Sequence, residues 1–433
     1  AKREAFTGAL LLGDDIFRGV SRGKESRAMI RAALVGVSGY GRWHLLMTME
    51  QALLGRLRLV GATVINGVEQ VAVCRRLERQ GVRVFATFEE MMNALAGEID
   101  LLLLPTGIQW HAPMTLAGLR AGAHVLVEKP VAATLQDVDS ILAAREATNR
   151  LVAVGFQDLH VPAAHDIKRR ILAGEIGTLR RAVVRGQWPR SSAYYARNVW
   201  AGRVQLGRDW VLDSPVSNAF AHFLMLALFW AGRTSDAAAE PVELDAELYR
   251  AGGIDSFDTA SLRLQTDEDV EILFYGSHAG QEEVVPQVKL IGDAGTITWV
   301  YERTYTVDRP DRPAEILPVP DQLDTRLTVL DAVLTRIERG RGFIVTPELA
   351  RGHVQVINAL HEYFPIHSVS ASHLEEKNGG AGVFRQIRGL DETMNEVVAS
   401  GLLFSAVGAP WARGSVGARC LRGYTSFGGA RVW

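Results

Sequence analysis

Between residues 31 and 155, short runs of Val, Leu and Ala alternate with longer amphipathic segments. The apolar runs include "RAALVG", "RLRLVGATV", "IDLLLLP", "HVLVEKP" and "LVAVGF". Strands that are apolar on both faces, with helices between them, are typical of a parallel sheet covered on both sides. This pattern predicts a doubly wound α/β sheet, which binds ligands at the carboxyl ends of its strands. Thr106 and Glu128–Lys129 follow two of these runs and are expected at that edge.

The pattern changes further along the chain, where consecutive strand-like runs are joined by polar or Gly-containing turns. Examples are "DTASLRLQT", "DVEILFYGSH" and "PQVKLIGDAGTITWV". These runs predict a second domain with a mostly antiparallel sheet. A helix is expected over residues 347–364. The apolar stretch 219–232 predicts a buried helix, because it is too short to span a bilayer.

Composition excludes several classes of protein. The 433 residues carry a formal net charge of −2, which argues against nucleic acid or an anionic membrane as the main partner. The two cysteines, Cys74 and Cys420, cannot form a disulfide framework, and their spacing matches no metal site. The sequence therefore predicts a cytoplasmic protein without a metal centre.

A glycine-rich turn follows the first apolar run, in "ALVGVSGYGRWHL". The pattern G-x-G-x-x-G places glycines at Gly36 and Gly41, with Ser38 at the middle position. Such a turn lets the backbone approach a pyrophosphate, and the helix that follows offers free N–H groups to it. The turn is a weak signal alone, but its place after the first strand of a βαβ series predicts a dinucleotide site.

The second strand lacks the carboxylate that commonly binds the ribose hydroxyls of NAD. It ends in "GATVINGVEQ", which offers Asn66 and no acid before Glu69. Asn66 is suited to bind the ribose, and equally suited to cap the next helix. The choice between NAD and NADP therefore stays open.

Together with this turn, the segments "LLLLPTGIQWH", "AGLRAGAHVLVEKPVA", "VAVGFQ" and "ILAGEIGTLRRAVV" resemble the Gfo/Idh/MocA family of nicotinamide-dependent oxidoreductases. The resemblance covers about residues 31–365. It implies a Rossmann dinucleotide-binding domain and then an α/β domain with an open-faced, largely antiparallel sheet. It also implies NAD or NADP as the cofactor.

The resemblance further implies roles for individual residues. Lys129, in the Glu-Lys-Pro segment, matches the lysine that lies beside the nicotinamide and takes part in proton transfer. The expected cofactor-binding residues are Gly36, Ser38, Gly39, Tyr40, Gly41, Asn66, Thr106, Gly107, His111, Glu128, Lys129 and Gln157.

The family's catalytic histidine lies in an Asp-x-x-x-His segment before an apolar helix. Alignment on "HFLMLALFWAG" makes His222 that histidine and puts Asn218 in place of the aspartate. An asparagine can orient an imidazole but cannot stabilise imidazolium by charge. Met225 stands where the family often has an acid. Lys129, His222 and Asn218 are the expected catalytic residues, and a structural histidine in an apolar helix is the alternative for His222.

Aromatic and charged residues are interleaved over residues 186–215. Aromatic faces suit the C–H surfaces of sugars, and Arg or Asp side chains suit hydroxyls or a carboxylate. The same mixture is also typical of subunit interfaces, so both readings stay open. The expected substrate-binding residues are Trp188, Arg190, Tyr195, Arg197 and Asp213.

These patterns predict an oxidoreductase that transfers a hydride between NAD(P) and a secondary alcohol of a sugar, inositol or related polyol. The alternatives are an NAD-dependent, redox-assisted glycoside hydrolase and a non-catalytic regulatory protein of the same fold. A homodimer or homotetramer is expected.

The expected domain organisation has four parts. Residues 1–29 form an N-terminal extension outside the core, residues 30–155 the Rossmann domain, and residues 156–365 the substrate and oligomerisation domain. Residues 366–433 form a C-terminal extension. Its last 20 or so residues are expected to be disordered, because they contain no acid and no periodic apolar pattern.

Overall fold

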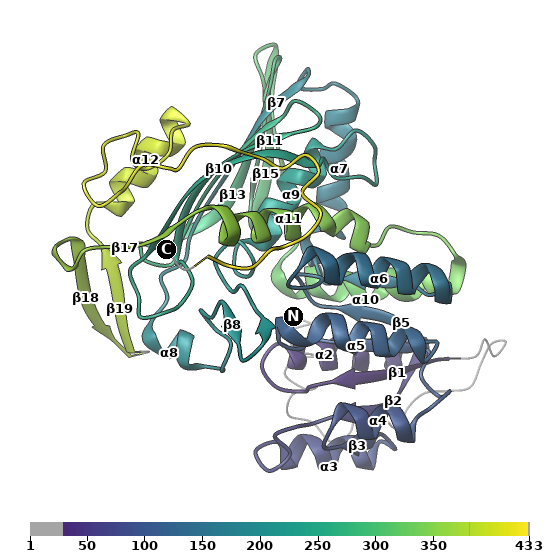
Figure 1. Ribbon diagram of the computed structural model, residues 1–433. Helices are drawn as coiled ribbons and strands as arrows, with labels where there is room; N and C mark the ends of the chain where they lie inside the picture. Colours follow the sequence, from purple (N-terminus) through teal and green to yellow (C-terminus); the bar gives the residue numbers. More distant parts are fainter. Residues whose placement is uncertain (1–28, 381, 432–433) are drawn as a thin grey trace.

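The N-terminal domain is a six-stranded parallel sheet in the order β3-β2-β1-β4-β5-β6 (Figure 1). The computed structural model describes residues 29–380 and 382–431, so the expectation for residues 1–28 lies outside the described residues. The strand order reverses between β1 and β4, which is where doubly wound sheets bind ligands. The strands are β1 (Ile30–Val35), β2 (Leu57–Thr63), β3 (Arg83–Phe85), β4 (Leu101–Leu104), β5 (His124–Val127) and β6 (Val152–Val154).

Helices cover both faces of this sheet, as the apolar strands require. Along β1, Ala33 and Val35 pack with the helices of one face, while Ala32 and Leu34 pack with those of the other. One layer holds α4 (Phe88–Ala94), α5 (Ile108–Arg120) and α6 (Leu135–Thr148); the other holds α2 (Gly41–Leu53), α3 (Val71–Arg79) and α10 (Gln322–Arg339). Helix α10 comes from the second half of the chain and completes the second layer.

The second domain is built on a ten-stranded mixed sheet, most of whose pairings are antiparallel. Strand β7 pairs in parallel with β12, and β10 with β17. The strands are β7 (Leu179–Gln187), β10 (Pro241–Arg250), β11 (Thr259–Thr266), β12 (Glu271–Ser277), β13 (Val284–Gly292), β14 (Thr296–Val300), β15 (Thr304–Arg309), β16 (Arg312–Pro318), β17 (Ile366–Ser368) and β20 (Arg419–Cys420). The predicted fold class is confirmed for both domains.

One face of this second sheet packs on α9 (Ala221–Ala231) and α11 (Pro347–Tyr363) (Figure 1). Every residue of α9 is buried, which agrees with the buried helix predicted over residues 219–232. The connecting and smaller elements of the domain are the 3₁₀ turn η1 (Gln157–Leu159), α7 (Pro162–Leu172), α8 (Ser192–Ala196), β8 (Gln205–Leu206) and β9 (Asp209–Trp210).

The opposite face is not fully open. Val183 of β7 and Tyr275 of β12 point to this side and pack with Met394, Phe404 and Trp411 from the C-terminal part of the chain. The covering residues come from α12 (Leu390–Ser400) and the loop after it, which follow η2 (Ala371–His373) and the hairpin β18 (Leu374–Gly379) and β19 (Gly382–Ile387). The expected open face is therefore partly capped by the chain itself. The homodimer or homotetramer stays a prediction.

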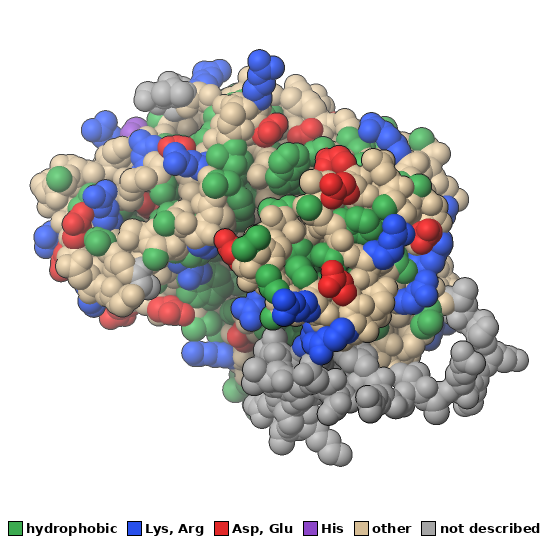
Figure 2. Space-filling view, turned by 90° about the horizontal axis from the view of Figure 1, so that it is seen from below, with side chains coloured by type: hydrophobic (Ala, Val, Ile, Leu, Met, Phe, Trp, Pro, Cys, Tyr) green, Lys and Arg blue, Asp and Glu red, His purple; other side chains and the backbone are tan. Residues whose placement is uncertain are grey.

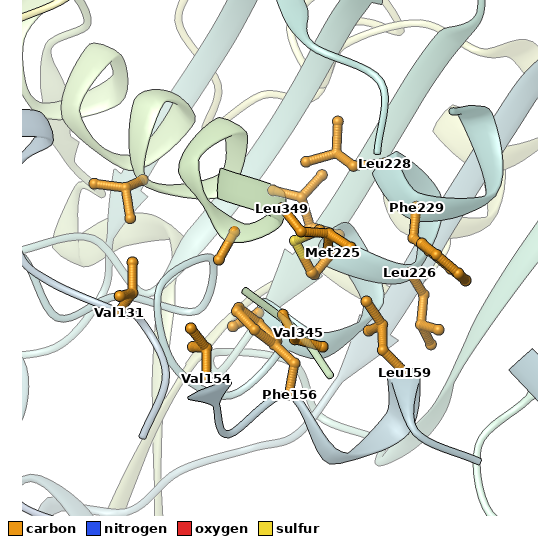
Figure 3. Close-up of a cluster of buried hydrophobic side chains, with 14 of the residues drawn as sticks. Val131, Val154, Phe156, Leu159, Met225, Leu226, Leu228, Phe229, Val345 and Leu349 are labelled. Atoms are coloured by element: carbon orange, nitrogen blue, oxygen red, sulfur yellow. The ribbon is translucent and has the colours of Figure 1, made fainter. Parts of the chain in front are cut away.

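The two domains share one core. Figure 3 shows Val131 and Val154 of the first domain beside Met225 and Leu349 of the second, and all four belong to one buried cluster. Asn358 of α11 ties the domains further, because its amide accepts from Leu135 N at 2.9 Å and donates to Ala133 O at 2.8 Å.

Helix α10 and Val345, which follows it by a few residues, also contact the first domain. Arg56 donates to Asp331 at 2.5 Å and to Glu338 at 3.1 Å. Val345 lies beside β6, and its carbonyl accepts from Val154 N at 2.8 Å. The predicted division at residues 155 and 365 is therefore wrong in detail: residues 322–345 return to the Rossmann domain, and β17 continues the second sheet beyond 365.

The C-terminal tail is ordered, which corrects the expectation of disorder for the last 20 or so residues. Strand β20 pairs with β10, and Leu421 and Phe427 are 1% and 5% exposed. Tyr424 donates its hydroxyl to Glu362 at 2.7 Å. A segment without a periodic apolar pattern can thus pack on the second domain through a few buried apolar side chains and one short strand.

On the face seen in Figure 2, basic and acidic side chains are interspersed with hydrophobic ones, in keeping with the small net charge. Among residues 29–380 and 382–431, no helix has both the length and the apolar character needed to cross a membrane.

The docked tail predicts a loss of stability when its anchor is truncated. Phe427 packs edge-on against Trp210, with ring centroids 5.2 Å apart. Phe427→Ala should lower the free energy of unfolding by about 3 kcal/mol, because it leaves a cavity in a shared core. Chemical denaturation measures this. Val416→Ala, at a 40% exposed position of the same tail, should stay within about 0.5 kcal/mol of wild type. A Phe427→Ala protein as stable as that control would show that the tail is not docked.

Candidate active site

The glycine-rich turn between β1 and α2 forms a cradle that a larger side chain would fill. Gly36 and Gly39 have φ of +94° and +55°, a region that favours glycine. A Cβ at Gly41 would lie 2.4 Å from the carbonyl oxygen of Gly36, so no side chain fits there. Helix α2 begins at Gly41, directly after Ser38, Gly39 and Tyr40. The turn therefore presents open backbone at a helix N-terminus, which suits a pyrophosphate.

The loop after β4 lies at the same edge of the sheet. The Oγ1 atom of Thr106 is buried and has no hydrogen-bond partner among the described residues, as expected of a group that waits for a ligand. Gly107 is the N-cap of α5. His111 is fully buried, and its Nδ1 and Nε2 lie 2.6 Å from Pro130 O and 3.1 Å from Thr106 O. His111 thus links two loops of the edge through backbone contacts rather than facing a cofactor with a free nitrogen.

Asn66 lies at the end of β2, but it does not cap α3, whose N-cap is Gln70. Its side-chain amide donates to Glu69 at 3.3 Å, and its carbonyl accepts from the backbone N–H of Glu69 and Gln70. The capping alternative is therefore wrong. The strand end supplies no carboxylate, but the Asn66–Glu69 pair places one in the loop that follows β2.

Glu128 faces into the first domain. Its Oε1 lies 2.9 Å from Nε2 of His44 on α2, and its side chain is 11% exposed. A Cβ at Gly155 would lie 2.4 Å from the same Oε1, so Gly155 is required for this carboxylate to fit. Glu128 therefore joins the end of β5 to the helix that follows the glycine-rich turn.

Lys129, the next residue, faces the second domain. Its Nζ donates to the backbone oxygen and to Oδ1 of Asn218, both at 2.8 Å. Burial lowers the pKa of Lys129 to about 8, and the nearby Glu128 carboxylate opposes that shift. An amine with this pKa can exchange a proton near neutral pH.

Asn218 and Asp213 have roles that differ from those expected. Asn218 does not orient His222; it holds Lys129, and its Nδ2 donates to Oδ1 of Asp213 at 3.0 Å. The other oxygen of Asp213 accepts from Gly202 N at 2.6 Å. Asp213 was expected to bind substrate, but both of its oxygens are occupied by the protein. The chain Asp213–Asn218–Lys129 instead fixes the position of the amine.

Asp158 stands beside His222, with 3.1 Å between Oδ2 and Nδ1. Neither atom has a well-aligned hydrogen-bond partner among the described residues. Burial raises the pKa of Asp158 to about 7, helped by Glu302, and burial with the Lys129 charge holds the pKa of His222 well below its usual value. At neutral pH the imidazole of His222 is therefore uncharged, and the carboxyl of Asp158 is uncharged below about pH 7. Asp158 follows Gln157 directly, and no pattern in the sequence marked it as the partner of His222.

Arg326 is a second group that sequence reasoning missed. It comes from α10, and its guanidinium carbon lies 4.1 Å from the ring centroid of Trp43 and 5.6 Å from that of Tyr40. It is 9% exposed, and its Nε and Nη1 are without hydrogen-bond partners among the described residues. Tyr40 also donates to Gln157 at 3.4 Å. A buried cation thus lies behind the glycine-rich turn.

The predicted substrate-binding residues gather in the second domain. Trp188 stacks on Phe220 with ring centroids 5.1 Å apart, and Arg190 lies over Trp188. Tyr195, Asp213 and Asn218 line one small cavity of about 10 Å³, enough for about one water. Met225, at the position where the resemblance predicts an acid, is fully buried in the core shared by the domains and does not line this cavity.

Comparison with known proteins agrees with this geometry. Residues 30–156 match the GFO_IDH_MocA family, described as "Oxidoreductase family, NAD-binding Rossmann fold". This match lies in the Rossmann domain and agrees with the resemblance to the Gfo/Idh/MocA family. The predicted family, Rossmann fold and nicotinamide dinucleotide cofactor are thereby confirmed.

Curated relatives of the chain include dehydrogenases of different substrates. It is 26% identical over 226 residues to 4-carboxy-2-hydroxymuconate-6-semialdehyde dehydrogenase of Sphingobium sp., covering 51% of the chain and 64% of the relative. It is 28% identical over 148 residues to scyllo-inositol 2-dehydrogenase (NAD(+)) of Bacillus subtilis, covering 34% and 42%. The chain thus spans less than two thirds of either relative.

Among solved structures, the WlbA dehydrogenase of Bordetella pertussis, crystallised with NADH and UDP-GlcNAcA, is similar in fold. The TM-score is 0.64 at 19% identity, covering 77% of this chain and 95% of that one. At this identity, the likeness supports the fold of both domains.

The cradle predicts the effect of a single methyl group on cofactor binding. Gly41→Ala should weaken NADH binding about tenfold or more, because its Cβ collides with the Gly36 carbonyl and displaces the helix N-terminus. Fluorescence titration with NADH measures this. The matched control is Gly414→Ala, where a Cβ meets no atom within 4 Å. Equal affinity in the two variants would contradict the placement of the pyrophosphate.

The raised pKa of Asp158 predicts a pH-dependent stability. Its pKa rises from 3.8 unfolded to about 7 folded, so between those values the folded state holds more proton and stability falls as pH rises. Asp158→Asn cannot ionise and should gain melting temperature over wild type at pH 8 but not at pH 4. Thermal melts across pH test this. Asp209→Asn, on the exposed β9, should show no such divergence. A pH-independent difference for Asp158→Asn would contradict the assignment.

Proposed function

We propose that this protein is an NAD(P)-dependent dehydrogenase that transfers a hydride between the nicotinamide and a secondary alcohol of a carbohydrate-like substrate. The observation that carries the proposal is the amine of Lys129, which Asn218 holds at 2.8 Å between the two domains. Its pKa of about 8 suits a group that takes a proton from an alcohol. The names of inositol dehydrogenases and of a sugar-nucleotide reductase among the relatives support the substrate class.

The residues at the sheet edge fit the dinucleotide. The turn Gly36–Gly41 would hold the pyrophosphate, Asn66 and Glu69 would face the ribose at the end of β2, and Thr106 would offer its unpartnered hydroxyl. When bound, the nicotinamide supplies the hydride acceptor or donor. The protein supplies position and the proton pathway.

Lys129 is the proton carrier in this proposal. Two of its three ammonium hydrogens are directed at Asn218, so one remains for the substrate hydroxyl. Below pH 8 the ammonium can donate a proton to a ketone oxygen, and above pH 8 the amine can accept one from an alcohol. Asp213 and Asn218 hold the amine in one place, so that little orientation entropy is lost in the reaction.

His222 and Asp158 form the second polar pair of the site. Because burial keeps the imidazole neutral, His222 acts as a hydrogen-bonding group and not as a fixed positive charge. After burial, the positive charge of Lys129 is a further cause of the lowered pKa of His222, so the two groups interact electrostatically across the domain junction. We assign His222 to orienting the substrate hydroxyl and Lys129 to moving its proton.

A screen of sugars and inositols with NAD(P), scored by absorbance of the reduced cofactor, tests the activity. When an alcohol is oxidised with NAD(P), kcat/KM should rise with pH to a plateau above about 8, because the free amine is the base. Lys129→Met should lower turnover about 10²–10⁴-fold and leave NADH binding within about twofold of wild type. Wild-type turnover in Lys129→Met would overturn the proposal.

Asn218→Asp sharpens the test, because it restores the acid that the family resemblance predicts. A carboxylate next to Nζ favours the ammonium, so the rise in kcat/KM should move to higher pH by about one pH unit or more. Asn93→Asp, on the exposed surface of α4, is the matched control and should leave the profile unchanged. An unshifted profile in Asn218→Asp would show that Lys129 is not the titrating base.

A further inference from the structure

Residues 188–213, here called the aromatic–arginine loop, run from the end of β7 to the Asn218 side of the site. The loop is anchored at Ser191, which forms a β-bridge with Phe384 of the C-terminal hairpin. It also reaches the first domain, where Val211 is buried against Ile108 and Ala133. The loop therefore spans both domains next to the reacting amine.

Two arginines of this loop carry positive charge without a matching acid. Neither Arg190 nor Arg197 forms an ion pair with any residue that the structure describes. By contrast, Arg203 on the same loop is paired with Asp255 at 3.0 Å. Nε of Arg190 is buried and lacks an acceptor in the described part of the chain. A buried donor of this kind costs free energy unless a ligand satisfies it.

Aromatic rings fix the positions of both guanidinium groups. The guanidinium carbon of Arg197 lies 3.5 Å from the ring centroid of Tyr194, and that of Arg190 lies 4.6 Å from it. Arg197 uses one N–H on the carbonyl of Tyr194, at 2.7 Å. A guanidinium held by its face keeps its edge free for a planar, bidentate contact with an oxyanion.

This pair lies on the substrate side of Lys129. Tyr194, which contacts both arginines, lines the same cavity as Asn218, the residue that holds the amine. The charge of Arg197 is one cause of the lowered pKa of Lys129 and opposes the raised pKa of Asp213. The two guanidinium groups are therefore close enough to act on a molecule bound at the amine.

The acids nearby form their hydrogen bonds within the protein and form no ion pair with either arginine. Asp213 is occupied by Gly202 and Asn218, and Asp258 accepts from the backbone N–H of Ala251 and Gly252. His278, which also lines the cavity, is neutral because burial lowers its pKa to about 3. Three cationic groups, Lys129, Arg190 and Arg197, thus outnumber the two acids, Asp213 and Asp258, around this space.

We propose that Arg190 and Arg197 form a subsite for an oxyanion, a carboxylate or a phosphate, on the sugar or polyol whose hydroxyl meets Lys129. The substrate is then an acidic carbohydrate and not a neutral one. This inference rests on the proposed dehydrogenase function, which it makes specific. The aromatic rings of the loop pack on the carbohydrate's C–H surface, while the guanidinium edges bind its charged end.

The test compares matched ligands on NADH-loaded protein by calorimetry. The panel sets each neutral sugar or polyol beside its uronate and its phosphate, beginning with glucose, glucuronate and glucose 6-phosphate. At least one acidic compound should bind about tenfold or more tightly than its neutral partner, and its affinity should fall with added salt. The better of the carboxylate and phosphate series identifies the oxyanion. A panel in which no acid exceeds its neutral partner would overturn the proposal.

Charge-removing variants locate the subsite. Arg190→Gln and Arg197→Gln should each reduce binding of the preferred acid about tenfold, and leave NADH binding and the melting temperature near wild type. Arg203→Gln, the paired arginine of the same loop, should keep the affinity for the acid. Full affinity in both of the first two variants would place the oxyanion elsewhere and overturn the assignment.

Different results would overturn the proposed dehydrogenase function and the proposed oxyanion subsite. Tight binding of an acidic carbohydrate that depends on Arg197, without hydride transfer to NAD(P) by any panel member, would leave the subsite standing and overturn the dehydrogenase function. Oxidation of neutral polyols at the same kcat/KM as their acids, unchanged by Arg197→Gln, would leave the function standing and overturn the subsite.

Discussion

The contact between Lys129 and Asn218 organises this molecule, because it joins the carboxyl end of β5 to the segment that leads into α9. Two hydrogen bonds of 2.8 Å hold the amine, and Asp213 holds the amide in turn. A buried ammonium is costly unless its hydrogens are satisfied. The second domain supplies that satisfaction, so the chemistry of the first domain depends on the placement of the second.

Glu128 and Lys129 are adjacent in sequence, but their side chains contact different domains. Glu128 binds His44 on α2 and requires Gly155 beside it, whereas Lys129 crosses to Asn218. One strand end therefore sets the position of the glycine-rich turn on one side and of the second domain on the other. This double role explains why a buried strand ends in an acid followed by a base.

The features that could be predicted from sequence depend on local pattern. Runs of apolar residues predicted the parallel sheet, and "VGVSGYG" predicted the dinucleotide turn. The features that could not be predicted depend on contacts between distant segments. Asp158 meets His222 only after folding, and Arg326 arrives on a helix far along the chain. The tail was misjudged because its composition resembles disorder, while Leu421 and Phe427 anchor it through the surface they bury.

Helix α10 has a consequence for how the chain is made. The first sheet is complete in sequence at β6, but one of its apolar layers needs Val329, Leu330 and Val333 of α10. A ribosome adds about 5–20 residues per second, so that layer waits roughly 10–40 s for its last helix. During that time Leu46 and Leu77 lie beside an uncovered surface. The Rossmann half of the nascent chain therefore lacks part of its apolar cover until the second half has been synthesised, although its sequence comes first.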